Sequence, residues 1–389
     1  MTWVARVSIN KLLVGAVATL LLSSCGLFSG KAKTGPEPAP LQEIEQTVAI
    51  EKLWSEDTGN GSAGQYLKLV PALGADAVFA ADYNGRVSAY AQDSGKRLWR
   101  TKIKENITGA TGYGGASVFV GTLKGNVYAF DADTGEQNWK TGISSEVLAP
   151  PVSNGSVVVA KSTDGKLFGL DAADGEKIWL YQRTVPTLSL RGTSAPVIFQ
   201  NVVLSGFASG KLTANDLATG RILWEVSVSY PSGRSEIDRL VDVDASPLIA
   251  NGILYTAAYQ GQINAISLRT GRRVWTRKVS TFEDMAVDGR NLYLVDNESR
   301  VRALDMQTGE PVWTQDSLLG RKLTGPAIIG QYIAVADYKG YVHLLEPSDG
   351  KLVGRTRVGG GGALSTPVSD GERLFLLTSK GKLTALGLK

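Results

Sequence analysis

The sequence predicts an all-β protein, an eight-bladed β-propeller built from four-stranded antiparallel blades. Three observations point to this fold: a motif that returns about every forty residues, a tryptophan at a fixed place in most copies, and short β-rich runs between glycine turns. A period of this length is typical of solenoids, propellers and other repeat arrays. The content of one repeat decides among them.

Most copies of the motif begin with a glycine, carry a second glycine ten residues later, and have a tryptophan four residues after that. A large ring at the same place in successive repeats predicts packing between neighbouring blades. The first glycines are Gly85, Gly125, Gly165, Gly210, Gly261, Gly340 and Gly381, with Ser299 in the remaining copy. The tryptophans are Trp99, Trp139, Trp179, Trp224, Trp275 and Trp313, and Gly354 stands in the seventh place.

The repeats are divided into short strands by tight turns. In one repeat the turn dipeptides are Asn154-Gly155, Asp164-Gly165 and Asp174-Gly175, and the runs between them are rich in Val, Leu and Phe. Such dipeptides supply the positive φ that tight hairpins need, and the apolar residues favour a pleated surface. Four short strands per repeat with a recurring aromatic residue are typical of a propeller blade.

The two ends of the repeat array complement each other. The last copy, from Gly381, stops at Lys389 before a tryptophan strand, whereas Trp54 lies ahead of the first copy. We therefore expect residues 46–56 to supply the outer strand of the blade whose other three strands end the chain, within one domain of residues 46–389. Closing the ring in this way covers strand edges that would otherwise stay unpaired.

The first 24 residues have the pattern of a secretory signal peptide. Arg6 and Lys11 give a positive start, and residues 12–22 form an apolar stretch too short for a membrane-spanning helix. The sequence Leu-Ser-Ser-Cys that ends at Cys25 resembles the bacterial lipobox, in which the cysteine carries the lipid, palmitate among its acyl chains. That resemblance implies a lipid anchor on Cys25 and, because Gly26 rather than aspartate follows, the outer membrane with the protein facing the periplasm.

Residues 25–45 are expected to form a flexible tether, because they are rich in proline, glycine and alanine. The chain has 41 basic and 37 acidic residues, a formal net charge of +4. Such a balanced charge does not indicate nucleic-acid binding. Membrane association is expected through the lipid alone.

Candidate catalytic and metal-binding residues have simpler structural interpretations. His343 is the one histidine and lies on an expected strand, so we expect a structural role. The segments 131–135 and 171–175 superficially look like calcium loops, but they lack the full ligand spacing, and an aspartate in a turn bonds its own backbone. We expect no enzyme activity, no metal and no cofactor.

Two consecutive blades carry insertions, at residues 183–195 and 230–246. Equivalent connections lie side by side on one face of such a ring, and loops of this kind often carry binding residues. In extended segments Leu188 and Leu190 share one side, as do Asp242 and Asp244. One interpretation is a binding patch that includes Arg191. The other is a salt bridge from Arg191 to one of the two aspartates that only ties the loops together.

The repeats resemble the quinoprotein (PQQ-like) repeat of eight-bladed propeller dehydrogenases. In those enzymes the cofactor pocket uses an adjacent cysteine pair, a calcium site and a catalytic aspartate on large loops, whereas Cys25 is the single cysteine here. The resemblance therefore implies the fold and not the activity. A periplasmic dehydrogenase-like enzyme with rearranged loops stays the alternative.

The lipobox, the tether, the repeats and the segments 183–192 and 236–244 together resemble the BamB family, the lipoprotein scaffold of the outer-membrane β-barrel assembly machinery. That resemblance implies docking on the periplasmic POTRA domains of BamA, alongside other lipoproteins of the machinery. It implies that Leu188, Leu190, Arg191, Asp242 and Asp244 contribute to this docking. Unfolded outer-membrane proteins could add to exposed blade strands. An envelope scaffold with another partner is the remaining alternative.

Overall fold

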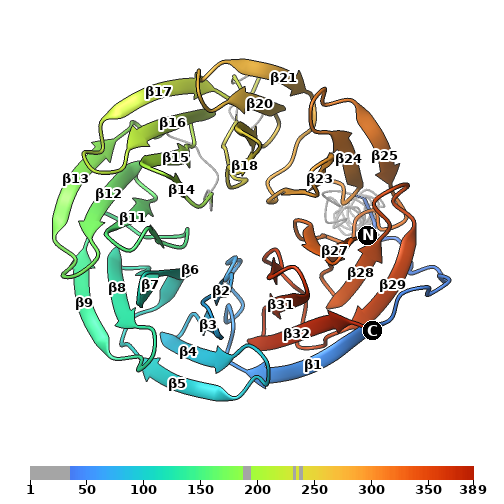
Figure 1. Cartoon of the computed structure of the whole chain (residues 1–389), viewed down its shortest axis with the longest axis horizontal. Helices are drawn as coiled ribbons and strands as arrows, with labels where there is room; N and C mark the ends of the chain where they lie inside the picture. The colour runs from blue at the N-terminus through green and yellow to red at the C-terminus, as the bar shows by residue number, and fades with distance from the viewer. Residues whose placement is uncertain (1–35, 187–193, 231–233, 236–239) are drawn as a thin grey trace, which may run out of the picture. The chain divides into compact units, whose positions relative to one another are not determined.

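The computed structural model describes residues 36–186, 194–230, 234–235 and 240–389. These residues form 32 strands in eight four-stranded antiparallel sheets. The strands all belong to one compact unit, Pro38–Lys389, in which the sheets stand as blades around a central axis (Figure 1). The predicted all-β, eight-bladed propeller is therefore confirmed.

The blades are numbered 1 to 8 along the chain, and four consecutive strands run outward from the axis in each of blades 1 to 7. The strands of blades 1 to 4 are β2 (Ala72–Leu73), β3 (Ala77–Ala81), β4 (Arg86–Ala91), β5 (Arg97–Lys102), β6 (Ile107–Gly114), β7 (Ser117–Thr122), β8 (Asn126–Asp131), β9 (Gln137–Gly142), β10 (Val152–Ser153), β11 (Val157–Ser162), β12 (Lys166–Asp171), β13 (Lys177–Gln182), β14 (Val197–Phe199), β15 (Val202–Gly206), β16 (Lys211–Asp216) and β17 (Ile222–Ser227). The strands of blades 5 to 8 are β18 (Leu248–Ala250), β19 (Ile253–Ala257), β20 (Ile263–Ser267), β21 (Arg273–Arg277), β22 (Ala286–Val287), β23 (Asn291–Val295), β24 (Val301–Asp305), β25 (Pro311–Gln315), β26 (Ala327–Ile329), β27 (Tyr332–Ala336), β28 (Tyr341–Leu345), β29 (Leu352–Arg357), β30 (Val368–Ser369), β31 (Arg373–Leu377), β32 (Lys382–Leu388) and β1 (Ile50–Asp57).

Blade 8 joins the two ends of the described chain. Strand β1 pairs antiparallel with β32, from Ile50 opposite Leu388 to Asp57 opposite Lys382, with one irregularity next to Trp54. The sheet order is β1-β32-β31-β30, so β1 is the outer strand of a blade whose other three strands end the sequence. The predicted closure of the ring is confirmed.

The seams between blades repeat one contact. The indole Nε1 of Trp275 donates a hydrogen bond to the carbonyl of Met306 in the next blade, at 3.0 Å. A Cβ on Gly309 would lie 2.6 Å from the Trp275 ring, and Gly309 has a φ of 70°. Glycine is therefore needed at this position, both because the turn requires a positive φ and because a side chain would collide with the indole ring. The same bond to the next blade is donated by Trp54, Trp99, Trp139, Trp179 and Trp313.

The seam between blades 4 and 5 lacks this contact. Trp224 donates no hydrogen bond to any part of the chain that the structure describes. A Cβ on Gly271 would lie 3.3 Å from its ring, farther than at Gly309. A cavity of about 290 Å³ opens beside Trp224, Phe199 and Leu268. This seam is therefore packed more loosely than the others.

The seam between blades 7 and 8 is filled by the N-terminal segment. Gly354 stands where other blades have tryptophan, and the amides of Thr47 and Val48 both donate to the carbonyl of Val353, at 2.9 and 3.0 Å. Val48 and Ile50 pack against the apolar core of these blades. The loss of the tryptophan thus makes room for a second passage of the chain.

Contact between the expected tether and the propeller begins before residue 46. The amide of Ala39 donates to the carbonyl of Leu319 at 2.8 Å, and Arg321 donates to the carbonyl of Ala39 at 2.9 Å. Leu41 and Ile44 pack against the apolar core of blades 6 and 7. Residues 39–45 therefore run along the propeller surface.

Candidate functional site

The two insertions lie next to each other, as predicted. The first joins β13 to β14 and the second joins β17 to β18. The amide of Ala195 donates to the Ser246 hydroxyl at 3.2 Å, which links the ends of the two insertions. The amide of Ser246 donates in turn to the Asp284 carboxylate at 2.8 Å. Three successive connections between blades are thereby tied into one face.

Lys161, on β11, fixes the base of the first insertion. Its side chain is half-buried, and Nζ donates to the carbonyls of Ser194 and Gly206, at 3.1 and 2.8 Å. The ammonium also lies 5.8 Å from the centre of the Phe207 ring, within the range of a cation–π contact. Ser194 is the first described residue after a gap, so Lys161 holds the insertion where it rejoins blade 4.

Asp242 and Asp244 lie in an extended part of the second insertion, and both are buried, with exposed fractions of 1% and 7%. Val243 between them packs in the core of blades 4 and 5. The alternation of side chains leaves both carboxylates near Lys161. Both carboxylates lie below the surface. Leu188, Leu190, Arg191 and Cys25 lie outside the described residues.

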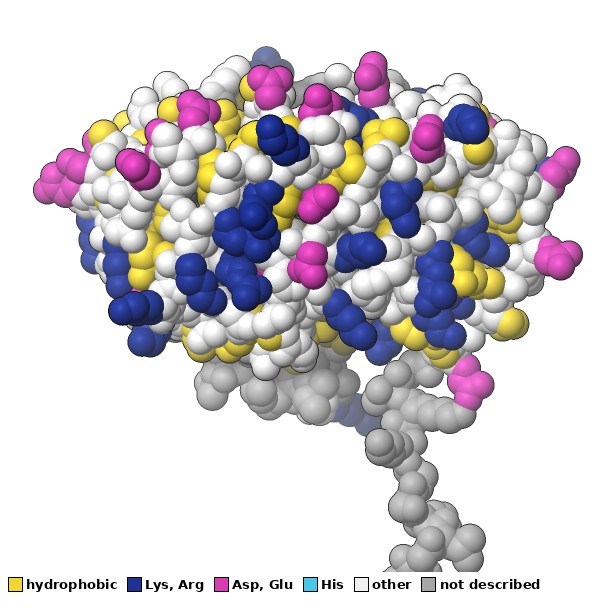
Figure 2. Space-filling model, turned by 90° about the horizontal axis from the view of Figure 1, so that it is seen from below, with side chains coloured by type: hydrophobic (Ala, Val, Ile, Leu, Met, Phe, Trp, Pro, Cys, Tyr) yellow, Lys and Arg dark blue, Asp and Glu magenta, His cyan; other side chains and the backbone are white. Residues whose placement is uncertain are grey.

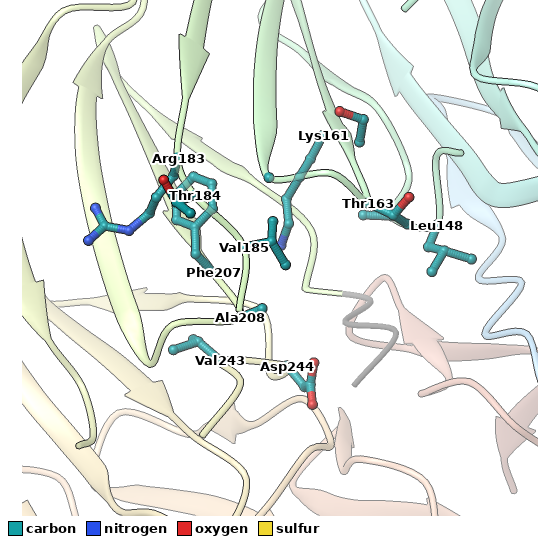
Figure 3. A pocket seen from close by; sticks show the side chains of 13 residues that line it. Leu148, Lys161, Thr163, Arg183, Thr184, Val185, Phe207, Ala208, Val243 and Asp244 are labelled. Atoms are coloured by element: carbon teal, nitrogen blue, oxygen red, sulfur yellow. The ribbon is translucent and has the colours of Figure 1, made fainter. Parts of the chain in front are cut away.

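The charges of this cluster are strongly affected by burial. Burial lowers the pKa of Lys161 to about 8, while Asp244 and Asp242 act in the opposite direction. Burial raises the pKa of Asp244, against the effects of Lys161 and Lys68. Among the described residues, Oδ1 of Asp244 has no hydrogen-bond partner. Figure 3 shows Lys161 and Asp244 on opposite walls of a small cavity, which has a volume of about 90 Å³.

A larger cavity, here called the central funnel, adjoins this small one and has a volume of about 610 Å³. Leu148 and Asp244 line both cavities. Tyr83, Leu123 and Tyr259 occupy the same position in their repeats, the turn after the second strand, and line the funnel from blades 1, 2 and 5. Since blades from different sides of the ring contribute, the funnel surrounds the axis on the face that carries the insertions.

An ion pair crosses the ring beside the funnel. Lys68 precedes blade 1 and Glu283 precedes blade 6, and their Nζ and Oε1 atoms lie 3.1 Å apart. Lys68 also donates to the carbonyl of Phe282 at 3.0 Å. Burial opposes the charge of Lys68, but Glu283, Asp284 and the Tyr66 side chain outweigh it and raise the pKa of Lys68. The lysine therefore stays charged and joins two blades that are not neighbours.

The nearly balanced charge of the chain is unevenly distributed. Five exposed basic residues lie on or beside β5, which forms the flank seen in Figure 2, where Lys and Arg side chains gather. They are Lys96, Arg97, Arg100, Lys102 and Lys104. The funnel has Asp244, Glu146 and Lys68 in its lining, and Glu283 behind it pairs with Lys68. Two carboxylates remain in the lining beside this ion pair, so a cationic partner is favoured at the funnel over this flank.

Comparison of the repeats in the sequence marks Lys161 as unusual. The equivalent positions of the other blades hold apolar residues or glycine, among them Ala81, Gly121, Gly206 and Leu377. A lysine at a position otherwise occupied by uncharged residues marks a special role. Tyr66 and Lys68 lie ahead of the first repeat, where no periodicity could identify them.

His343 and Asp131 make contacts within the propeller that agree with the structural interpretations from the sequence. His343 is fully buried, its Nδ1 accepts a hydrogen bond from Arg355 at 3.2 Å, and its Nε2 lies 3.4 Å from the Asp337 carboxylate. The Asp131 carboxylate accepts the amides of Asp133 and Thr134 within its own turn, at 3.0 and 2.8 Å. In the part of the chain that the structure describes, no group of three His, Cys, Asp or Glu residues could hold a metal ion.

Comparison of whole sequences finds a family of similar proteins. The outer membrane protein assembly factor BamB of Alkalilimnicola ehrlichii is 48% identical over 379 residues, which are 97% of this chain and 97% of that protein. The protein of the same name from Escherichia coli K12 is 33% identical, over 96% of this chain and 98% of its own. The family profile described as outer membrane protein assembly factor BamB matches residues 83–315 and 297–389. The chain belongs to the BamB family.

Solved structures agree with this assignment. The crystal structure of BamB from Moraxella catarrhalis matches with a TM-score of 0.80 and 31% identity, over 87% of this chain and 99% of that one. A quinohemoprotein alcohol dehydrogenase from Pseudomonas putida matches with a TM-score of 0.68 but 12% identity, which shows a shared fold alone. Among the described residues of this BamB-family chain, no helix is long and apolar enough to cross a membrane.

Proposed function

We propose that this BamB-family protein is a non-enzymatic scaffold that assists the insertion of β-barrel proteins into the outer membrane by docking on the POTRA domains of BamA. The relatives are named outer membrane protein assembly factors, which supports this role. The observation that carries the docking surface is the joining of the two insertions on one face, through Lys161, Ala195 and Ser246.

The two insertions have different parts in this proposal. Leu188, Leu190 and Arg191 of the first insertion contact BamA. Asp242 and Asp244 of the second are buried, so they contribute to docking through the shape that they give to the loop. A rigid ring suits such a role because its loops are held in fixed relative positions.

The anchor proposed at Cys25 limits where the ring can work. Ala39 is hydrogen-bonded to the propeller, and thirteen residues lie between it and Cys25. An extended chain of this length reaches at most about 50 Å. The propeller therefore stays within that distance of the inner leaflet of the outer membrane, on the periplasmic side, where other lipoproteins of the machinery and unfolded barrel proteins are its proposed neighbours.

A scaffold without a cofactor fits the sequence better than an enzyme. The quinoprotein enzymes that share the fold use an adjacent cysteine pair, and this chain has one cysteine in all. The named relatives are assembly factors over nearly their whole length. The shared architecture is therefore used for binding and not for oxidation.

Affinity capture tests the proposal. The tagged, lipid-modified protein is recovered from gently solubilised outer membranes, and its partners are identified by mass spectrometry. We expect BamA with the wild type and its loss from a folded variant that carries Leu188→Asp and Arg191→Glu. The matched control is Arg97→Glu, an exposed charge reversal on β5. Capture of a different partner set without BamA would refute the proposal.

A further inference from the structure

The central funnel has a chemistry that the proposed BamA surface does not use. Its volume of about 610 Å³ lies within the range of pockets that hold small ligands or peptide side chains. Leu67, Leu123 and Leu148 give it apolar walls, and Tyr66 and Tyr259 add aromatic ones. The cavity is larger than one side chain requires, so its occupant brings neighbouring apolar groups with it.

Asp244 is the polar group in this cavity that lacks a partner. It is 7% exposed, and its Oδ1 atom has no hydrogen-bond partner in the described part of the chain. A buried carboxylate is unfavourable unless a cation or hydrogen-bond donors compensate it. Lys161 lies on the opposite wall of the adjoining small cavity, and its Nζ atom donates to Ser194 and Gly206 and not to Asp244. The carboxylate is therefore available to a cation from outside the protein.

The aromatic side chains around Asp244 suit an organic cation. Tyr66 is 69% exposed, and it lines the funnel together with Asp244. Tyr259 and Phe282 pack with their ring centres 6.3 Å apart. Phe282 already has Lys68 over its ring at 5.2 Å. One cation–π contact at the funnel thus joins two residues of the protein itself. The rings of Tyr66 and Tyr259 can make a second one with a bound cation.

A metal ion fits this site less well than a side chain. The described residues contain no group of three His, Cys, Asp or Glu residues that could hold a metal. The nearby acidic groups and the apolar walls together match a basic side chain that lies between apolar residues.

We propose that the central funnel binds a polypeptide segment that inserts an arginine or lysine side chain against Asp244 and rests its apolar neighbours on Leu123 and Leu148. The proposal goes beyond docking on BamA, because the chemistry of the segment decides binding. It can be tested without any other component of the assembly machinery.

Isothermal titration calorimetry on the full-length protein provides the test. The probes are three acetylated tripeptide amides that have leucine at both ends and arginine, norleucine or glutamate in the middle. We expect the arginine peptide to bind at least tenfold more tightly than the other two. Asp244→Asn should remove this tenfold preference, whereas Asp133→Asn, in an exposed turn, should leave it unchanged.

A second variant guards against a folding defect in Asp244→Asn. Tyr66→Ala alters an exposed side chain, so the ring should stay folded while the affinity for the arginine peptide falls about threefold or more. Equal binding of the arginine and norleucine peptides would overturn the proposal, as would equal effects of Asp244→Asn and Asp133→Asn. Arginine amide that binds as tightly as the tripeptide would also overturn it, in favour of a small amine ligand.

Discussion

The carbonyl oxygen of Val48 lies directly against Gly354, in the space that a larger side chain would fill. A Cβ on residue 354 would be 2.7 Å from that oxygen. The seven other blades place a tryptophan at this position of the repeat. In the seventh blade, backbone of the N-terminal segment therefore fills the space that the tryptophan side chain takes in other blades. The closing strand lies at the same seam.

Gly354→Ala should destabilise the protein by about 1–3 kcal/mol, because the added methyl group forces the N-terminal segment away from Val353. The free energy of unfolding, measured by chemical denaturation, checks this. Gly387→Ala is the matched control on β32, since a Cβ there would meet Leu53 at an ordinary 3.4 Å. Equal losses in the two variants would show that the close approach at Gly354 has no energetic weight.

Trp275→Phe should lower the free energy of unfolding by about 1 kcal/mol more than Trp224→Phe does. Of these two tryptophans, Trp275 has an indole hydrogen bond within the described residues, and Trp224 has none there. Trp224 is also less buried and borders a cavity, so the difference between the two variants reports the bond across the seam together with the tighter packing of Trp275. Thermal unfolding of the two variants measures it. If Trp224→Phe is the more damaging change, the blade 4–5 seam is not the looser one.

Asp337 should make the stability depend on pH in acid. Burial opposes its ionisation, but hydrogen bonds from His343, Tyr341 and Arg321 outweigh it and lower the pKa of Asp337 to about 2. Its contribution to stability is thus complete above the usual carboxyl pKa and is lost as the pH falls through about 2. The wild type should lose more stability between pH 4 and pH 2 than Asp337→Asn does. Parallel curves for the two proteins would contradict this assignment.

At neutral pH the same substitution should cost about 3–5 kcal/mol, since it leaves the buried Arg321 without its carboxylate. Asp370→Asn, which breaks a more exposed ion pair with Arg373, should cost much less. Urea unfolding at pH 7 compares the two variants. Equal losses of stability in the two variants would mean that burial does not determine how much these ion pairs contribute to stability.

Lys161→Met should weaken binding to BamA at least tenfold while the ring stays folded, because Ser194 loses the donor that fixes the first insertion. Lys166→Met, on the next strand and in a more exposed pair with Asp164, should leave binding unchanged. Pull-down with purified BamA and far-UV circular dichroism measure binding and folding. Full binding by Lys161→Met would show that the insertion keeps its position without this lysine.

The repeat pattern predicted the fold almost completely, because each blade repeats the same turn glycines and the same tryptophan. Trp54 ahead of the first copy even indicated the closing strand. The pattern could not show that residues such as Ala39 lie along the propeller, since that contact depends on a groove formed by two blades. The sequence alone also could not show that Asp242 and Asp244 are buried near Lys161, because this lysine is distant in sequence.

The most direct test of the central claim is the affinity of the full-length protein for purified full-length BamA in detergent, measured by biolayer interferometry. Wild type, Arg191→Glu and the control Arg97→Glu are compared at one salt concentration, with folding checked by thermal unfolding. We predict that Arg191→Glu binds at least tenfold more weakly, while Arg97→Glu binds like the wild type. Equal affinities for all three proteins would contradict the assignment of the insertion face as the BamA surface.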